Sequence, residues 1–189
     1  MKQKVEKQRF LISEFREEAA WLSFMHREGW KFVSTDGGKY RFEPCEGEDF
    51  IYQLDFKKNG VAEDDYIQMF ADYGWDYVFR FRKWFYFRKK RTTEEEDLSI
   101  FSDKESKIEF CKRVIGYDII RVLPILLLLL ATNYLLFFTS LAEKSDFLQG
   151  AKYGVVSGTA IALVFSLSVT INQYKRLYQM IRNYENPIK

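Results

Sequence analysis

The sequence predicts an α+β fold in which duplicated β-α-β-β units form an antiparallel sheet with two helices on one face, followed by a two-helix transmembrane hairpin. Two observations predict this fold. Residues 5–43 align without a gap on residues 50–88, and two long uncharged runs lie toward the C-terminus. The alignment predicts the duplicated units of the N-terminal part, and the uncharged runs predict the transmembrane hairpin.

The composition excludes several classes of protein. Lys and Arg together number 29 against 27 for Asp and Glu in 189 residues, so bulk charge does not favour nucleic acid. Hydrophobic residues make up 47% of the chain and aromatic residues 18%, which excludes a disordered chain. One histidine and two cysteines leave little for a metal site or a disulfide framework.

The internal repeat appears when the chain is shifted by 45 residues. Gly29-Trp30 then falls on Gly74-Trp75, and Phe42 falls on Phe87. Apolar positions between these matches coincide as well. Because all the matches share one register, we interpret them as two copies of one structural unit.

Each unit is expected to contain a strand, a helix and two further strands. In the second unit, residues 50–56 alternate in polarity as a half-buried strand does. The acids at 63–65 favour the first turn of a helix, which Gly74 ends. In the first unit, Gly29 ends the helix and residues 36–38 turn a hairpin.

The last strand carries consecutive aromatic residues, so both of its faces must hold rings. One interpretation is that amphipathic rings are half-exposed there or pack on the segment before the membrane. The other is a platform for a partner protein, peptide or ligand, with Phe85 and Phe87 on an open sheet face. The candidate partner-binding residues are Trp84, Phe85, Tyr86 and Phe87.

The strand lies within a basic stretch, residues 80–91, that allows three interpretations. We rank a solvated strand end first, contact with anionic headgroups second and nucleic acid third. The cytosolic domain is expected over residues 1–91, followed by an acidic linker at 92–104. A juxtamembrane helix at 105–119 then acts either as a rigid connection or as a tether.

Two uncharged runs are long enough to cross a bilayer as helices. We expect transmembrane helices at 120–142 and 153–174, an extracytoplasmic loop at 143–152 and a cytoplasmic tail at 175–189. Basic residues flank the far ends of both runs, so both termini are expected in the cytoplasm of a bacterial cell, with no signal peptide. A buried helical hairpin in a soluble protein is the alternative.

The second run contains a Gly-x-x-x-Gly spacing at Gly154 and Gly158. Such small residues let two membrane helices approach closely. The partner helix is either the first run of the same chain, another copy of the chain or a helix of another membrane protein.

Residues that could carry catalysis are sparse. No phosphate-binding glycine loop, metal-ligand spacing or nucleophile elbow occurs in the chain. We interpret His26 as a packing or surface residue, and the acids Glu46, Glu48 and Asp49 as a solvated turn rather than a cation site. The prediction is a non-enzymatic protein with no catalytic, cofactor-binding or metal-binding residues.

Several motifs together resemble a known family. These are the two Gly-Trp segments at 28–33 and 73–78, the Tyr52-x-x-Asp55-Phe56 strand, and the aromatic end at 84–88. They resemble the bacterial family of domain of unknown function 2812, over roughly residues 8–90. The resemblance implies a membrane-anchored partner of a PadR-like transcriptional regulator, and it implies no catalytic residues.

The expected function is therefore a membrane-anchored regulatory protein. Its cytosolic domain would bind a PadR-like regulator and couple membrane or antimicrobial stress to gene expression. The alternative is an accessory subunit of a membrane transporter or antimicrobial-resistance complex. The expected partners are the regulator or the transporter, the lipid bilayer and possible further copies of the chain, with no direct nucleic-acid contact.

Overall fold

The computed structural model describes residues 3–57, 62–91, 104–140 and 146–186. The predicted linker falls almost wholly on residues outside these ranges, as does part of the predicted extracytoplasmic loop. The chain divides into two compact units, one made of Met1–Val114 with Met180–Lys189 and the other of Ile115–Gln179. The first unit therefore includes more of the chain than the 1–91 domain that the sequence predicts.

In the described part of the first unit, two complete helices and six strands follow one another in the order that the repeat predicts. The elements are β1 (Lys4–Lys7), α1 (Phe15–Arg27), β2 (Trp30–Thr35), β3 (Lys39–Pro44), β4 (Phe50–Phe56), α2 (Glu63–Asp72), β5 (Asp76–Phe81) and β6 (Trp84–Lys90), and a short 3-10 turn, Ile12–Glu14, precedes α1. Two long helices complete the chain, α3 (Lys104–Ser140) and α4 (Asp146–Glu185). The start of α3 and the end of α4 also belong to the first unit.

The strands form two antiparallel sheets, not the single sheet that the sequence predicts. Their orders are β1-β3-β2 and β4-β6-β5. The physical reason is that the strands of each repeat hydrogen-bond to one another. The first strand of a repeat pairs with its third, β1 with β3 and β4 with β6. The two sheets contact each other through their edge strands β2 and β5.

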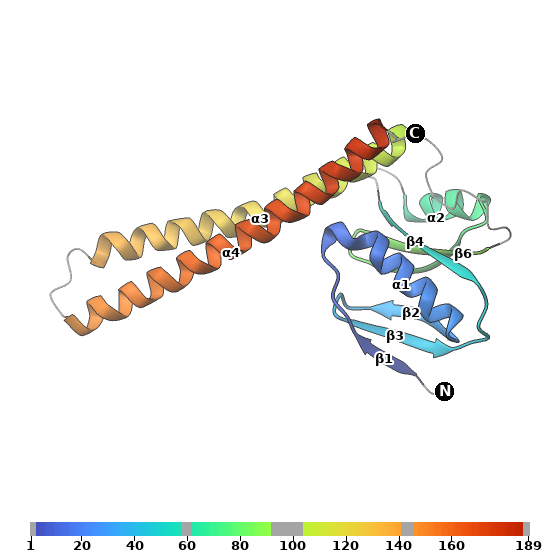
Figure 1. Cartoon of the computed structure of the whole chain (residues 1–189), viewed down its shortest axis with the longest axis horizontal. Coiled ribbons are helices and arrows are strands. Elements are labelled where there is room, and N and C mark those ends of the chain that lie inside the picture. The colour runs from blue at the N-terminus through green and yellow to red at the C-terminus, as the bar shows by residue number, and fades with distance from the viewer. Residues whose placement is uncertain (1–2, 58–61, 92–103, 141–145, 187–189) are drawn as a thin grey trace. The chain divides into compact units, whose positions relative to one another are not determined.

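The two helices do not share a face, which corrects the second part of the expected architecture. Helix α1 packs against both β2 and β4 and lies between the two sheets, whereas α2 covers the far side of the second sheet (Figure 1). Adjacent residues of a strand point to opposite faces. Accordingly the side chain of Ile51 packs with α2, while the hydroxyl of Tyr52 lies 2.8 Å from Nδ1 of His26 on α1.

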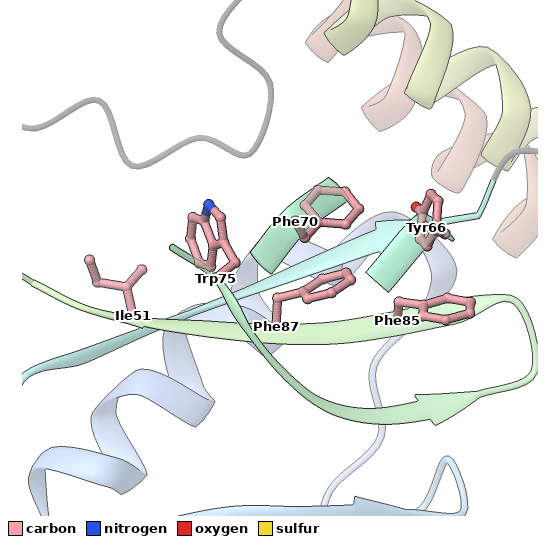
Figure 2. Close-up of a cluster of buried hydrophobic side chains, with 6 residues drawn as sticks. All are labelled: Ile51, Tyr66, Phe70, Trp75, Phe85 and Phe87. Atoms are coloured by element: carbon pink, nitrogen blue, oxygen red, sulfur yellow. The ribbon is translucent and has the colours of Figure 1, made fainter. Parts of the chain in front are cut away.

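The core beneath α2 is largely aromatic. Figure 2 shows its six residues converging from α2, from strands β4 and β6, and from the segment between α2 and β5. They are Ile51, Tyr66, Phe70, Trp75, Phe85 and Phe87. The ring centroids of Phe70 and Phe87 lie 4.2 Å apart. This cluster explains why β6 carries rings at alternate positions on this face.

The two β-α-β-β sets agree in detail. Both sheets place their third strand in the centre, and both carry a bulge near the start of their second strand, after Phe32 and after Tyr77. Both helices are followed by a glycine in the left-handed region, Gly29 with φ +85° and Gly74 with φ +79°. Each of these pairs is separated by the 45 residues of the sequence repeat.

The second unit consists of α3 from Ile115 onward and of α4 as far as Gln179. Both helices are long and apolar enough to cross a membrane, with apolar segments of mean hydropathy 2.2 and 2.0. Helix α3 is continuous from Lys104 to Ser140 and contains Pro124. Within this unit, the hydroxyl of Thr159 donates to Oδ1 of Asn133 at 2.7 Å, which joins the two helices by a polar contact.

Candidate functional site

The candidate site is a pocket of about 460 Å³ in the first unit. One wall is α1 and another is strand β4 with the residues before it. The first turns of α3 and the last turn of α4 contribute Phe110 and Tyr184. Pockets that bind small molecules occupy about 300–1,000 Å³, so this volume suits a ligand of ordinary metabolite size.

Helix α1 presents small residues to the pocket. Ala19, Ala20 and Ser23 lie on one side of the helix, because residues three and four apart share a face. The Ser23 hydroxyl donates to the carbonyl of Ala19 at 2.9 Å and accepts the N–H of Tyr52. This bridge fixes α1 against β4, an edge strand of its sheet, and leaves space beside the alanines.

Four basic side chains line the pocket and one acid accompanies them. The basic residues are Arg16, Arg27, Arg91 and Lys107, and the acid is Asp49. The acid is engaged, since its carboxylate lies 2.9 Å from Nε of Arg91. The pocket is therefore cationic although the whole chain is nearly neutral.

Aromatic contacts hold the two long helices at this pocket. The ring centroids of Phe15 and Phe110 lie 5.0 Å apart. The Arg16 guanidinium lies 5.2 Å from the ring centroid of Tyr184, which is a cation–π distance. Contacts of the first turns of α3 and the last turn of α4 thus form part of the pocket wall.

A second connection ties α3 to the sheet through a buried carboxylate. Asp55 is 1% exposed and accepts the hydroxyl proton of Tyr66, while Arg113 of α3 lies 3.8 Å away. Burial raises the pKa of the Asp55 carboxyl, and the hydrogen bond from Tyr66 and the charge of Arg113 oppose that rise. Removing either partner would leave a polar group in the core.

Glu18 is a second buried carboxylate. The hydroxyls of Tyr40 and Tyr86 both donate to its Oε1 at 2.7 Å. Burial raises the pKa of the Glu18 carboxyl, and the two tyrosine hydrogen bonds act against this. The arrangement joins α1 to both sheets, since Tyr40 lies on β3 and Tyr86 on β6.

His26 is buried, as one of the sequence interpretations holds. Its Nδ1 lies 2.8 Å from the Tyr52 hydroxyl and its ring stacks on Phe50 with centroids 4.5 Å apart. Burial, aided by the nearby Arg88 charge, lowers the pKa of the imidazole. A histidine so enclosed serves packing and holds β4 to α1.

The structure buries three of the four aromatic residues that the sequence proposes as an exposed platform. Phe85, Tyr86 and Phe87 are 1%, 3% and 0% exposed, and Trp84 is half-buried. The platform interpretation assumed an open sheet face, and that assumption is wrong because α2 covers one face and α1 with the first sheet covers the other. Partner binding through these rings would require the core to open.

The glycines of the predicted helix-packing motif lie on an open surface of α4. A side chain added at Gly154 or Gly158 would meet nothing within 4 Å. Within the described part of the second unit, therefore, this face does not pack on the chain's own α3. Of the interpretations that the sequence leaves open, contact with another copy of the chain or with a helix of another membrane protein stays.

The acids at the predicted turn pair with the end of β6. Glu48 lies 2.7 Å from Lys90, and Asp49 pairs with Arg91 as described above. The basic stretch is thus partly neutralised. Among the residues that the structure describes, no three His, Cys, Asp or Glu side chains come together as metal ligands.

Comparison with known proteins places the chain in a family. The sequence profile described as "Protein of unknown function (DUF2812)" matches residues 14–123, more than half of the chain. The chain belongs to this DUF2812 family. No curated protein and no solved structure matches it. The DUF2812 match extends beyond residue 91 into α3, in agreement with the packing of Phe110 and Arg113 on the αβ core.

Sequence reasoning missed the pocket. Its basic residues come from α1, from the end of β6 and from α3, so no continuous sequence motif predicts the pocket. The one available signal is the uneven face of α1, where Arg16, Ala20 and Arg27 are exposed beside the small buried Ala19. A basic and small-residue stripe next to an apolar one is also the ordinary pattern of a surface helix, so it does not by itself predict a pocket.

Proposed function

We propose that this DUF2812 protein is a membrane-anchored regulatory protein without catalytic activity. The observation that carries the proposal is the continuity of α3 and α4. Each helix holds an apolar segment fit to cross a membrane and also residues that line the pocket of the αβ unit. A change at either end of these helices has a direct structural route to the other end.

We further infer that the αβ unit arose by duplication of a β-α-β-β segment. The equal strand orders, the equivalent bulges and the two left-handed glycines support this. The two copies now differ in surroundings, since α1 lies between two sheets and α2 covers only one. In the proposed division of labour, α1 of the first copy and β4 of the second copy form the pocket, and the second copy also supplies the aromatic core beneath α2.

The protein is proposed to cross the bacterial cytoplasmic membrane twice with both termini in the cytoplasm. Basic residues precede the first apolar segment and follow the second, and short basic segments resist translocation. The αβ unit would then face the cytoplasm, where a transcriptional regulator could reach it.

The proposed partner is a PadR-like transcriptional regulator, as the family resemblance implies. Regulation requires that the partner bind one state of the protein more tightly than another, since equal affinity would shift nothing. The exposed surface of the first sheet and of α2 is available for such contact, whereas the aromatic residues of β6 are not.

The test is crosslinking in native membranes with the full-length chain, followed by mass spectrometry. We expect a winged-helix regulator crosslinked to the αβ unit, and the purified full-length protein in phosphatidylcholine nanodiscs should release that regulator from its operator DNA. The full chain is needed because Phe110, Cys111 and Val114 are buried in the unit and a fragment ending at residue 91 would lack them. Absence of any regulator in the crosslinks, together with unchanged DNA binding, would overturn the proposal.

A second candidate function is an accessory subunit of a membrane transporter or resistance complex. The open face at Gly154 and Gly158 favours it, because another helix could approach closely there. Gly158→Leu should then abolish copurification of a transporter, while Leu127→Ile, on the exposed face of α3, should leave it intact. Equal copurification of both variants would remove this candidate.

A further inference from the structure

We infer that the pocket between α1, β4 and the ends of the two long helices binds an amphipathic anion, a molecule with one carboxylate or phosphate group and an apolar chain. The inference deepens the proposed function and rests on it for its regulatory consequence. The binding itself rests on the pocket alone.

The apolar part of the argument is the wall of the pocket. Phe15, Leu54 and Phe110 line it and are 8%, 4% and 4% exposed. Their neighbours hold them, since Phe15 and Phe110 both contact the ring of Trp84, at 5.9 and 6.1 Å between centroids. A wall of side chains already fixed by packing offers an apolar chain a surface that needs little reordering.

The charge part of the argument is the surplus of cations. Arg16 and Arg27 lie exposed on α1 about three turns apart, and both line the pocket. The single acid is already paired with Arg91. Among the described residues that line the pocket, no other carboxylate competes with an entering anionic group for the cations, and guanidinium groups match carboxylate and phosphate geometry.

A neutral apolar molecule or a purely polar anion fits less well. The first would leave the cations unused, and the second would leave the apolar wall uncovered. A ligand with both parts uses both features, and its apolar chain would lie beside the small side chains of Ala19 and Ala20. The pocket thus favours molecules in which charge and chain are joined.

Occupation of the pocket has a structural consequence for the long helices. The Arg16 guanidinium packs on the ring of Tyr184 of α4, and Phe110 of α3 packs on Phe15 of α1. An anion that recruits Arg16 competes with its contact to Tyr184. A ligand at this position would change the contact that holds the end of α4 to α1, and this is the regulation that we infer.

The binding test uses the full-length protein in phosphatidylcholine nanodiscs and a photoactivatable diazirine derivative of dodecanoate. We expect label on peptides from α1 and β4, and competition by octanoate, decanoate and dodecanoate that strengthens by up to about fourfold for each added methylene. Dodecyltrimethylammonium, which has the same chain and the opposite charge, and inorganic phosphate alone should compete weakly. Empty nanodiscs give the background.

Two variants test the two features separately. Ala20→Trp, at an exposed position of α1, fills the pocket and should abolish labelling, whereas Met69→Trp on the exposed face of α2 should not. The double variant Arg16→Gln/Arg27→Gln should weaken competition by dodecanoate about tenfold. Arg41→Gln on the exposed face of β3 is its control. Circular dichroism of each variant verifies the fold.

Comparing labelling in nanodiscs with and without phosphatidylglycerol shows whether the ligand is a membrane lipid or a free amphiphile. Lower labelling by the free probe in these discs identifies a membrane lipid as the occupant, and equal labelling identifies a free amphiphile. The inference would be overturned if the Ala20→Trp and arginine variants were labelled, and competed by dodecanoate, as the wild type is. It would also be overturned if dodecyltrimethylammonium competed as strongly as dodecanoate. Labelling of the pocket with no release of the regulator from DNA would support ligand binding in the pocket and contradict the proposed regulatory partner. Release of the regulator with no labelling of the pocket would support the partner and contradict ligand binding in the pocket.

Discussion

At the scale of single residues, the most informative group is the carboxylate of Glu18. Its pKa is raised by burial, so the folded protein holds the proton more tightly than the unfolded chain does. Stability from this group is present below the unfolded pKa, about 4.3, and is lost as pH rises through the higher folded pKa. Glu18→Gln should remove this loss, because a Gln Oε1 can still accept both tyrosine hydroxyls.

The measurement is the free energy of unfolding of Glu18→Gln and of the wild type between pH 4.5 and 8. We expect the variant to gain on the wild type as pH rises, with a slope of at most about 1.4 kcal/mol per pH unit. Glu28→Gln, at an exposed position, is the control and should run parallel to the wild type. A Glu18→Gln curve that also runs parallel would show that the carboxyl titrates alike in both states.

The two left-handed glycines give a paired prediction. Replacing either by Ala forces an L side chain into the left-handed region, which costs about 1 kcal/mol. Gly29→Ala should cost more than Gly74→Ala, because its new Cβ would lie 3.3 Å from the carbonyl oxygen of Cys45, whereas the other meets only the flexible end of Lys89. Urea unfolding followed by tryptophan fluorescence measures the difference. The reverse order would contradict the crowding at Gly29.

At the scale of elements, the attachment of α3 to β4 depends on Asp55 and Arg113. A double-mutant cycle with Asp55→Asn and Arg113→Gln should give a coupling free energy of about 1–2 kcal/mol, since Asp55 is buried and Arg113 is mostly covered. The partly exposed pair Lys31 and Glu43, 3.5 Å apart, is the control and should couple by less than about 1 kcal/mol. Coupling of equal size in the two pairs would mean that Asp55 does not hold α3.

Local patterns in the sequence predicted the elements well, because their causes are local. The strand Trp30–Thr35 begins after the left-handed Gly29, as expected, and the aromatic strand begins at Trp84. The partition into two sheets depends on which strands hydrogen-bond, and alternation along one strand does not reveal that. The consecutive rings of β6 show the difficulty, since the same pattern fits an open face or a strand covered on both sides.

The candidate site was less predictable than the elements. Arg16 and Lys107 line one pocket although 91 residues separate them in the chain, and only tertiary packing brings them together. The family motif does contain one residue whose role the structure explains. Asp55 is buried, accepts a hydrogen bond from Tyr66 and lies beside Arg113, and no residue spacing in the sequence predicts this role.

At the scale of the whole molecule, the proposed topology places the αβ unit and the hairpin tip on opposite sides of the membrane. Ser145→Cys in the predicted extracytoplasmic loop should react with a membrane-impermeant maleimide in intact cells. The native Cys45, which is half-buried in the αβ unit, should react only after the cells are permeabilised, and buried Cys111 should react only after unfolding.

The control for this labelling is internal, because Cys45 reports from the same molecule. Basic residues before the first apolar segment and after the second are the physical cause of the expected result, since they resist translocation. Moving two of these charges to the tip, by Gln149→Lys and Ser145→Lys with Lys175→Gln and Arg176→Gln, should weaken the preference and expose Cys45 in a fraction of molecules. Reaction of Cys45 in intact cells of the unaltered protein would place the αβ unit outside and end the proposal of a cytoplasmic regulator as its partner.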